Sequence, residues 1–116
     1  MIAHVLLFRV SDDVPASDRK ALIDAWTKAL RDIPSIRRAH VGKRVRIGRE
    51  YEQLMRNDYP YAAVIEFEDK AGLRAYLDHP AHADMANRFF AVLADVLVYD
   101  FEMQLSPESW LDSVGI

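Results

Sequence analysis

The stretch from Ile2 to Val10 limits the possible folds of this chain more than any other part of the sequence. Its residues are apolar except for His4 and Arg9, and it is rich in the Val, Leu and Phe side chains that favour strands. Because successive side chains of a strand point to opposite faces, both faces of this strand are apolar. The two sets are Ile2, Leu6 and Phe8 on one face, and Ala3, Val5 and Leu7 on the other. A sheet that contains this strand must therefore be covered on both sides.

The following residues predict one helix and two further strands. Apolar residues at helical spacing indicate an amphipathic helix that begins after the turn at Pro15 and ends before Pro34. These residues are Leu22, Ile23, Trp26, Ala29, Leu30 and Ile33. The mixed, basic segment 36–47 predicts an edge strand, since charged side chains on an edge discourage pairing with other chains. Residues 50–58 carry no period and predict a loop, after which residues 59–68 alternate as a third strand.

The second half of the chain predicts a helix broken by proline, followed by a last strand. Leu73, Tyr76 and Leu77 share one side of a short helix, and Pro80 fits the first position of a second helix that continues to Leu93. The final strand is predicted at residues 97–103. The order β-α-β-β-α-β is that of the ferredoxin-like fold, an α+β architecture in which both helices cover one face of a four-stranded antiparallel sheet. Since no helix remains for the other face, we expect a second copy of the chain to cover it in a homodimer.

Length and composition limit the classes of protein that fit. With 116 residues the chain is long enough for one domain, which we assign to residues 1–105, leaving residues 106–116 as a C-terminal tail with Trp110 and Leu111. The absence of cysteine excludes disulfides, thiolate metal sites and cysteine nucleophiles. A formal net charge of -3 disfavours a nucleic-acid partner. No signal peptide or long apolar run is found, so we expect a cytoplasmic protein without a membrane partner.

Four stretches of the sequence are similar to a known family. They are residues 2–8 (IAHVLLF), 33–36 with 41–43 (IPSI and VGK), 76–82 (YLDHPAH) and 98–102 (VYDFE). The Tyr-x-x-His-Pro-x-His segment, combined with an N-terminal His-Val-x-Leu-Phe strand, resembles the stress-responsive dimeric α/β barrel (Dabb) domain family. The resemblance covers the chain except for the tail after Leu105. It implies a ferredoxin-like subunit that dimerises into a barrel.

The resemblance also implies a set of site residues. The best-understood activity of the family is that of plant polyketide cyclases, which close a ring by an aldol-type reaction without a cofactor. By this resemblance His82 is the general base, and Asp100 on the last strand hydrogen-bonds to it. Tyr76 orients or protonates the substrate, and His4 lines the same cavity. The cyclases also carry a His on the third strand, where this chain has the sequence YAAV at residues 61–64.

The position of His82 supports a role as base independently of the resemblance. It falls in the first turn of the helix that Pro80 begins, where the positive end of the helix dipole disfavours the imidazolium and keeps the ring neutral at pH 7. A neutral ring can accept a proton, and a carboxylate on its other nitrogen would fix the tautomer. The alternative is that His82 and His79 only cap or pack against the start of the helix.

His4 is unusual because it interrupts an apolar strand. A buried imidazole there needs a hydrogen-bond partner. If His4 faces the helices, it can approach Tyr76 and His82, whereas a shift of register by one residue would place it on the dimer face. The alternative interpretations are a histidine and a tyrosine that only pack in the core.

Other interpretations of the same residues remain open. A metal site could use His4, His79 and His82, but no carboxylate completes the set, and we predict no metal. The six Lys and Arg residues between Arg37 and Arg49 fit either a solvated edge or a substrate with a phosphate or carboxylate. An RNA-recognition domain has the same topology, but Ala63 stands where a stacking aromatic is needed. A haem-degrading monooxygenase of the same fold would need His4 or His82 as the axial ligand.

We therefore expect a homodimeric ferredoxin-like barrel protein with a small-molecule cavity lined by His and Tyr side chains, and with no cofactor. As an enzyme it would perform cofactor-independent acid/base chemistry on a carbonyl or polyketide-like compound, as a polyketide cyclase-like lyase. The alternative from a different class is a non-catalytic homodimer, related to stress or binding a carbonyl or aromatic ligand.

Overall fold

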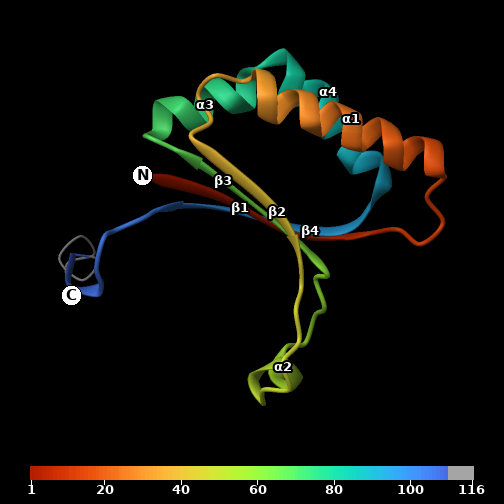
Figure 1. Cartoon of the computed structure of the whole chain (residues 1–116), viewed down its shortest axis with the longest axis vertical. Helices are drawn as coiled ribbons and strands as arrows, with labels where there is room; N and C mark the ends of the chain where they lie inside the picture. Colours follow the sequence, from red (N-terminus) through yellow and green to blue (C-terminus); the bar gives the residue numbers. More distant parts are fainter. Residues whose placement is uncertain (110–116) are drawn as a thin grey trace.

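The computed structural model of the chain describes residues 1–109 and shows a sheet with helices along one side (Figure 1). In chain order the elements are β1 (Ile2–Val10), α1 (Ala16–Asp32), β2 (Arg38–Lys43), α2 (Tyr51–Leu54), β3 (Tyr61–Phe67), α3 (Lys70–Asp78), α4 (Pro80–Val92) and β4 (Leu93–Glu102). The strands lie in the order β2-β3-β1-β4, and each neighbouring pair is antiparallel. The predicted ferredoxin-like α+β fold is confirmed.

The register of the sheet decides which side chains meet the helices. His4 pairs with Ile65 of β3 and with Asp100 of β4, so these three side chains point to the same face. Helices α1, α3 and α4 cover that face (Figure 1). His4 is only 5% exposed there. Of the two faces that the sequence left open for His4, the structure therefore has it on the helix face.

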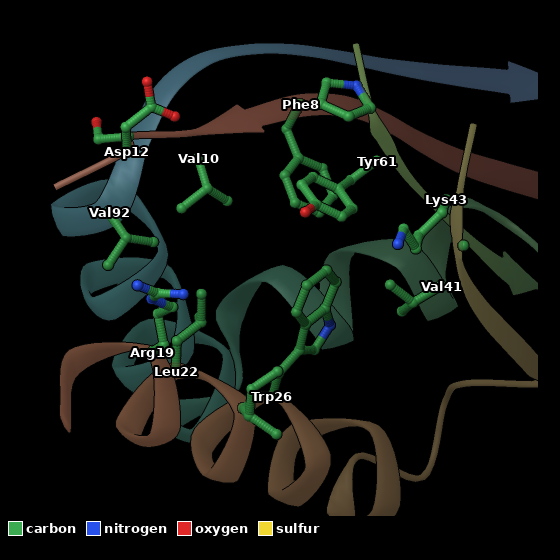
Figure 2. Close-up of a pocket in the computed structure, with 14 residues that line it drawn as sticks. Phe8, Val10, Asp12, Arg19, Leu22, Trp26, Val41, Lys43, Tyr61 and Val92 are labelled. Atoms are coloured by element: carbon green, nitrogen blue, oxygen red, sulfur yellow. The ribbon is translucent and has the colours of Figure 1, made fainter. Parts of the chain in front are cut away.

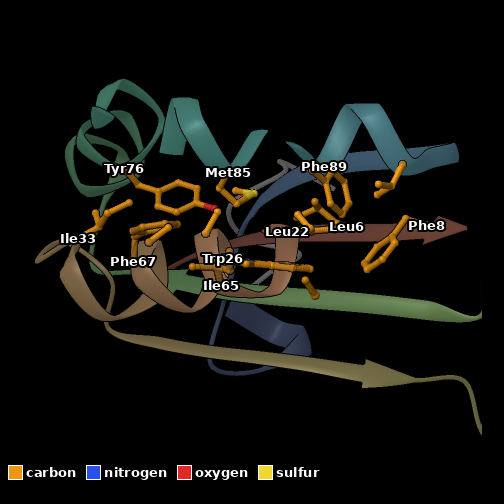
Figure 3. Packing of buried hydrophobic residues seen from close by; sticks show 14 of the residues in the cluster. Leu6, Phe8, Leu22, Trp26, Ile33, Ile65, Phe67, Tyr76, Met85 and Phe89 are labelled. Atoms are coloured by element: carbon orange, nitrogen blue, oxygen red, sulfur yellow. The ribbon is translucent and has the colours of Figure 1, made fainter. Parts of the chain in front are cut away.

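The core fills the space between the sheet and the helices (Figure 3). Phe8 of β1, Trp26 of α1 and Phe89 of α4 form a mutual aromatic cluster with ring centroids 4.9 to 5.9 Å apart. Tilted and edge-to-face pairs at this spacing add about 0.5–1.5 kcal/mol each beyond the area that they bury. This aromatic cluster ties the middle of the sheet to the two longest helices.

The boundaries of β2 and β4 differ most from the sequence predictions, and β2 covers only Arg38–Lys43 of the predicted segment 36–47. Strand β4 begins at Leu93, four positions earlier than predicted, because the backbone turns from helical to extended directly after Val92. Leu93 pairs with Val10 across an irregularity in β1, so no loop separates α4 from β4. Both residues at this junction are apolar, and periodicity alone does not mark where a helix becomes a strand.

The predicted loop between β2 and β3 contains the single turn of α2. The carboxylate of Glu52 in this turn accepts hydrogen bonds from the backbone N–H groups of Ile47 and Gly48, at 2.7 and 3.1 Å. Gly48 has a positive φ of 81°, which a residue without a Cβ adopts at no steric cost. The turn is exposed and has no apolar stripe, so its sequence carries no helical period.

The face of the sheet opposite the helices has an apolar centre, and no element of the described residues covers it. We call it the open face, and its apolar centre consists of Ala3, Val5, Leu7, Ala62, Val64, Leu97, Tyr99 and Phe101. Polar and charged side chains lie on the same face around this centre, namely Arg9, Arg38, His40, Glu66 and Asp95. The connection that carries α2 and the segment after β4 both extend toward this side (Figure 1). Trp110 and Leu111 of the predicted tail lie outside the described residues. No helix within residues 1–109 is long and apolar enough to cross a membrane.

Candidate functional site

The junction of α3 and α4 brings Tyr76 and His82 together. A single residue, His79, ends α3 and begins α4: its backbone N–H donates to the carbonyl of Tyr76, and its Nδ1 accepts from the N–H of Ala81 at 3.0 Å. Pro80 then occupies the first position of α4, where its missing N–H is not needed. The interpretation of His79 as a capping residue is therefore confirmed, and His82 falls in the first turn that it caps.

Three rings from three elements meet beneath this junction. Tyr76 is 1% exposed, and its ring lies edge-on to His82 at 4.6 Å and to His4 at 5.8 Å between centroids. Burial raises the pKa of Tyr76 to about 12, so the phenol keeps its proton over the physiological range.

The carboxylate of Asp100 pairs with His4 and not with His82. Its Oδ1 accepts from Nδ1 of His4 at 2.5 Å, across the directly opposed positions of β1 and β4. The prediction that Asp100 hydrogen-bonds to His82 is therefore wrong, because its partner is His4. Because a carboxylate can only accept, Nδ1 of His4 carries a proton, and in the neutral form of this ring Nε2 is then the acceptor.

The surroundings of His82 keep its ring neutral. Burial lowers its pKa, and the nearby charge of His4 lowers it further, while a backbone hydrogen bond to Leu77 opposes the shift. Burial disfavours a positive charge on His82, and so does repulsion from His4 whenever that ring is protonated. At pH 7 the imidazole is therefore unprotonated at one nitrogen, which is the state that a general base requires.

The side chains of His4, Tyr76 and His82 share a cavity of about 190 Å³ between the sheet and helices α1, α3 and α4. His4, Tyr76 and His82 are its polar lining, and the other walls are almost entirely apolar, with Met85, Phe89 and Ile65 among them. Asp100 does not line it and acts on it only through His4. The sequence analysis missed Phe90 and Val98 as cavity residues. The pairing of Val98 with Leu6 would have identified one of them, but it requires the β1–β4 register.

No grouping of three or more His, Asp or Glu side chains that could hold a metal ion occurs within residues 1–109. The Nδ1 of His79, considered above as a ligand, already accepts from a backbone N–H. On the third strand, Tyr61 stacks on Phe8 with centroids 5.6 Å apart and faces the helices. An aromatic contact thus occupies part of the strand that carries a histidine in the cyclases.

Comparison with known proteins places the chain in a family. The family model described as Stress responsive A/B Barrel Domain matches residues 2–103. The chain is 30% identical over 101 residues to the stress-response A/B barrel domain-containing protein HS1 of Arabidopsis thaliana, with 87% of this chain and 88% of HS1 covered. The crystal structure of At3g17210 from Arabidopsis thaliana is similar with a TM-score of 0.73 and 28% identity, covering 91% of this chain and 98% of that one.

A bacterial structure extends the comparison. A dimeric ferredoxin-like protein of unknown function from Thermobifida fusca has a TM-score of 0.66 and 29% identity, with 88% of this chain and 90% of that chain covered. The fold, the match along nearly the whole chain and the relative in Arabidopsis thaliana agree with one another. The chain belongs to the stress responsive A/B barrel domain family.

Proposed function

We propose that this chain forms a homodimer in which each subunit performs cofactor-independent acid/base chemistry on a small carbonyl compound. The observation that carries the proposal is the convergence of His4, Tyr76 and His82 on one cavity. A neutral imidazole and a protonated phenol in contact form an acid/base pair that works near neutral pH. The different environments of these two groups support the proposed roles, with His82 as base and Tyr76 as hydrogen-bond donor.

The proposed reaction begins with the removal of a proton from the carbon next to the substrate carbonyl. The free nitrogen of His82 takes this proton, and the electron pair of the C–H bond moves onto the carbonyl oxygen. The Tyr76 hydroxyl donates a hydrogen bond to the enolate oxygen as its charge develops. The enolate carbon then regains a proton or attacks a second carbonyl carbon, whose oxygen receives the proton from His82. No electron is gained or lost overall, so the reaction requires no redox cofactor.

His4 completes the site as an oriented acceptor. Asp100 holds the Nδ1–H, and the lone pair on Nε2 belongs to a residue that lines the cavity. A substrate hydroxyl or enol can donate a hydrogen bond to this nitrogen. Asp100 is accordingly a positioning residue in this proposal, since it acts through His4.

The size of the cavity favours a small substrate. Its volume of about 190 Å³ is close to the roughly 150 Å³ of an apolar core cavity that holds one benzene molecule. Sites for drug-sized ligands measure about 300–1,000 Å³. A compound with one ring or a short chain fits this space better than an extended polyketide, and the apolar walls favour an apolar body.

The open face supports the proposed homodimer. Its contiguous apolar side chains are of the kind that marks an interaction surface, and Tyr99 and Phe101 on it are about half exposed. The α2 connection and the segment after β4 extend beyond the same face, where they can flank a second copy (Figure 1). The Thermobifida fusca relative is described as dimeric. Two copies related by a two-fold axis would bury both open faces against each other.

Exchange of α-protons for deuterium tests the proposed chemistry without knowledge of the natural substrate. The protein is incubated in D2O with a panel of small ketones and aldehydes, and loss of the α-proton signal is followed by NMR. We expect catalysed exchange for at least one compound. His82→Asn should reduce it by about 10²–10⁴-fold, and Tyr76→Phe by about 10²–10³-fold.

His79→Asn is the matched control, because asparagine still caps a helix and His79 lies outside the cavity. It should leave exchange nearly unchanged. Equal losses in His79→Asn and His82→Asn would contradict the role of His82. If the panel binds to the cavity but none of it exchanges, the non-catalytic binding protein is the correct alternative.

A further inference from the structure

A second, larger cavity lies on the other side of the aromatic cluster, between the first half of α1 and the end of the sheet near β2 (Figure 2). Its volume of about 580 Å³ falls within the about 300–1,000 Å³ of typical small-molecule sites. Trp26 contributes to the walls of both cavities, but His4, Tyr76 and His82 do not line this one. It is therefore separate from the proposed acid/base site, and we call it the α1 cavity.

The walls of the α1 cavity suit a flat or extended apolar group. Phe8 and Tyr61 stack with an interplanar angle of 27°, and Trp26 adds a third ring at 5.9 Å from Phe8. Leu22 and Val92 from the helices and Val41 from β2 complete the apolar lining. The indole Nε1 of Trp26 is buried and has no hydrogen-bond partner within the described residues. This region of the core thus combines ample apolar contact with a donor whose desolvation is not compensated.

The basic residues around β2 differ in whether their charge is already paired. Four of them lie within 4.0 Å of a carboxylate, in the pairs Arg37–Glu68, Arg38–Glu66, Arg44–Asp58 and Arg46–Asp58. Lys43 has no carboxylate at that distance among residues 1–109. Because it pairs with Tyr61 in the sheet, its side chain points to the helix face, and Figure 2 shows its ammonium turned toward the α1 cavity. This charge is available to a ligand in the cavity.

The other charged groups of the α1 cavity limit the charge of that ligand. Arg19 uses its Nε and one terminal nitrogen on the carbonyl of Val14, at 3.2 and 3.1 Å, which leaves part of its guanidinium free. Asp12 also lines the cavity and adds a negative charge. One available ammonium and a partly occupied guanidinium, opposed by one carboxylate, match a single negative charge. A phosphate dianion would need more free donors than these side chains offer.

We propose that the α1 cavity binds an amphipathic monocarboxylate, with its apolar chain or ring on Phe8, Trp26 and Tyr61 and its carboxylate at Lys43. Apolar burial supplies most of the affinity, and the charge pair orients the ligand and disfavours uncharged analogues. Binding at this site does not depend on the proposed acid/base reaction, since the two sites share only the Trp26 wall.

Octanoate, which is ionised at pH 7.5, is the probe, and octanamide is its uncharged counterpart. In a Trp110→Phe background Trp26 is the remaining tryptophan of the sequence, so its fluorescence follows binding. We expect saturable binding of octanoate and binding of octanamide that is about tenfold weaker. Lys43→Gln should weaken octanoate binding about five- to tenfold and leave octanamide unchanged. Backbone amide NMR shifts should change at residues 41–43 and 61.

Lys28→Gln is the control, because it removes the same charge from an exposed position of α1 outside the cavity. It should not affect either ligand. The proposal is overturned if octanoate and octanamide bind equally, if Lys28→Gln acts as strongly as Lys43→Gln, or if octanoate shows no saturable binding. Amide shifts confined to Tyr76 and His82 would also overturn it, because they would place octanoate in the smaller cavity.

Discussion

The hydrogen bond between Asp100 and His4 gives the sharpest test of the structure, because the sequence pointed to a different partner. Asp100→Ala leaves the Nδ1–H of a buried imidazole without its acceptor. Losing a hydrogen bond to a charged group lowers the free energy of unfolding by about 1.5–3 kcal/mol. The Asp100 side chain is 43% exposed, so water can replace part of the lost bond. We therefore expect a loss of about 1–2 kcal/mol.

Urea denaturation of the single and double variants measures this pair directly. For a small domain, a loss of that size lowers the urea midpoint by about 0.5–1 M. A double-mutant cycle with Asp100→Ala and His4→Phe should give a coupling energy of about 1–2 kcal/mol. The same cycle with His82→Asn in place of the His4 variant should give less than about 0.5 kcal/mol. Protein concentration must be held constant, because a dimer is stabilised by mass action.

The matched control is Asp24→Ala, which breaks an exposed ion pair with Lys20 one helical turn away. Such pairs contribute about 0.3–0.5 kcal/mol, so this variant should barely move the midpoint. Coupling of Asp100 to His82 and not to His4 would refute the register of β1 and β4 described above. Equal effects of Asp24→Ala and Asp100→Ala would show that the buried imidazole does not depend on its carboxylate.

Three further predictions concern other parts of the molecule. Folding lowers the pKa of His82, so as the pH falls below about 6.5 this residue takes up a proton in the unfolded chain before it does so in the folded one. The free energy of unfolding should therefore decrease as the pH falls below that value, by at most about 1.4 kcal/mol per pH unit. In pH-dependent urea titrations, His82→Asn should flatten this slope; an unchanged slope would assign it to other groups. Leu7→Asp places a charge on the open face and should shift the sedimentation coefficient from dimer to monomer, while Ile23→Asp on α1 should not; a dimeric Leu7→Asp protein would rule out the open face as the interface. Asp69→Ala removes the acceptor for the N–H of Gly72 at the start of α3. Thermal or urea unfolding should show that this variant loses about 1 kcal/mol of unfolding free energy, and that Asp69→Ser retains most of it. Equal stability of the Asp69→Ala and Asp69→Ser variants would mean that the cap is not needed.

Most of the fold was predictable because its signals are local. The alternation within Ile2–Val10 indicates a central strand, and Pro34 and Pro80 mark the end of one helix and the start of another. The prediction of where β4 begins was wrong for a local reason as well, since Val92 and Leu93 are both apolar and fit either a helix or a strand. The short α2 is held by Glu52 contacts to backbone groups, which composition does not reveal.

The proximity of Tyr76 and His82 was predictable from the sequence, but the partner of Asp100 was not. The spacing of Tyr76 and His82 about Pro80 is local, so one capped junction determines it. The partner of Asp100 depends on how β4 aligns with β1, across 96 positions of sequence, and a shift by two residues would bring another side chain to His4. The α1 cavity was missed for the same reason, because Lys43 and Tyr61 share a face only once β2 and β3 are in register.

The single-residue junction at His79 separates the proposed acid/base pair from the walls that shape the cavity. Tyr76 and His82 lie three positions to either side of it, so their mutual geometry is set within one short segment of chain. The apolar walls that decide the shape of the cavity come from later turns of α4 and from α1, β1, β3 and β4. Substitutions in those walls can change which compound fits without disturbing the pair of rings. A family built on this arrangement can vary the walls of the cavity while keeping this pair of rings in place.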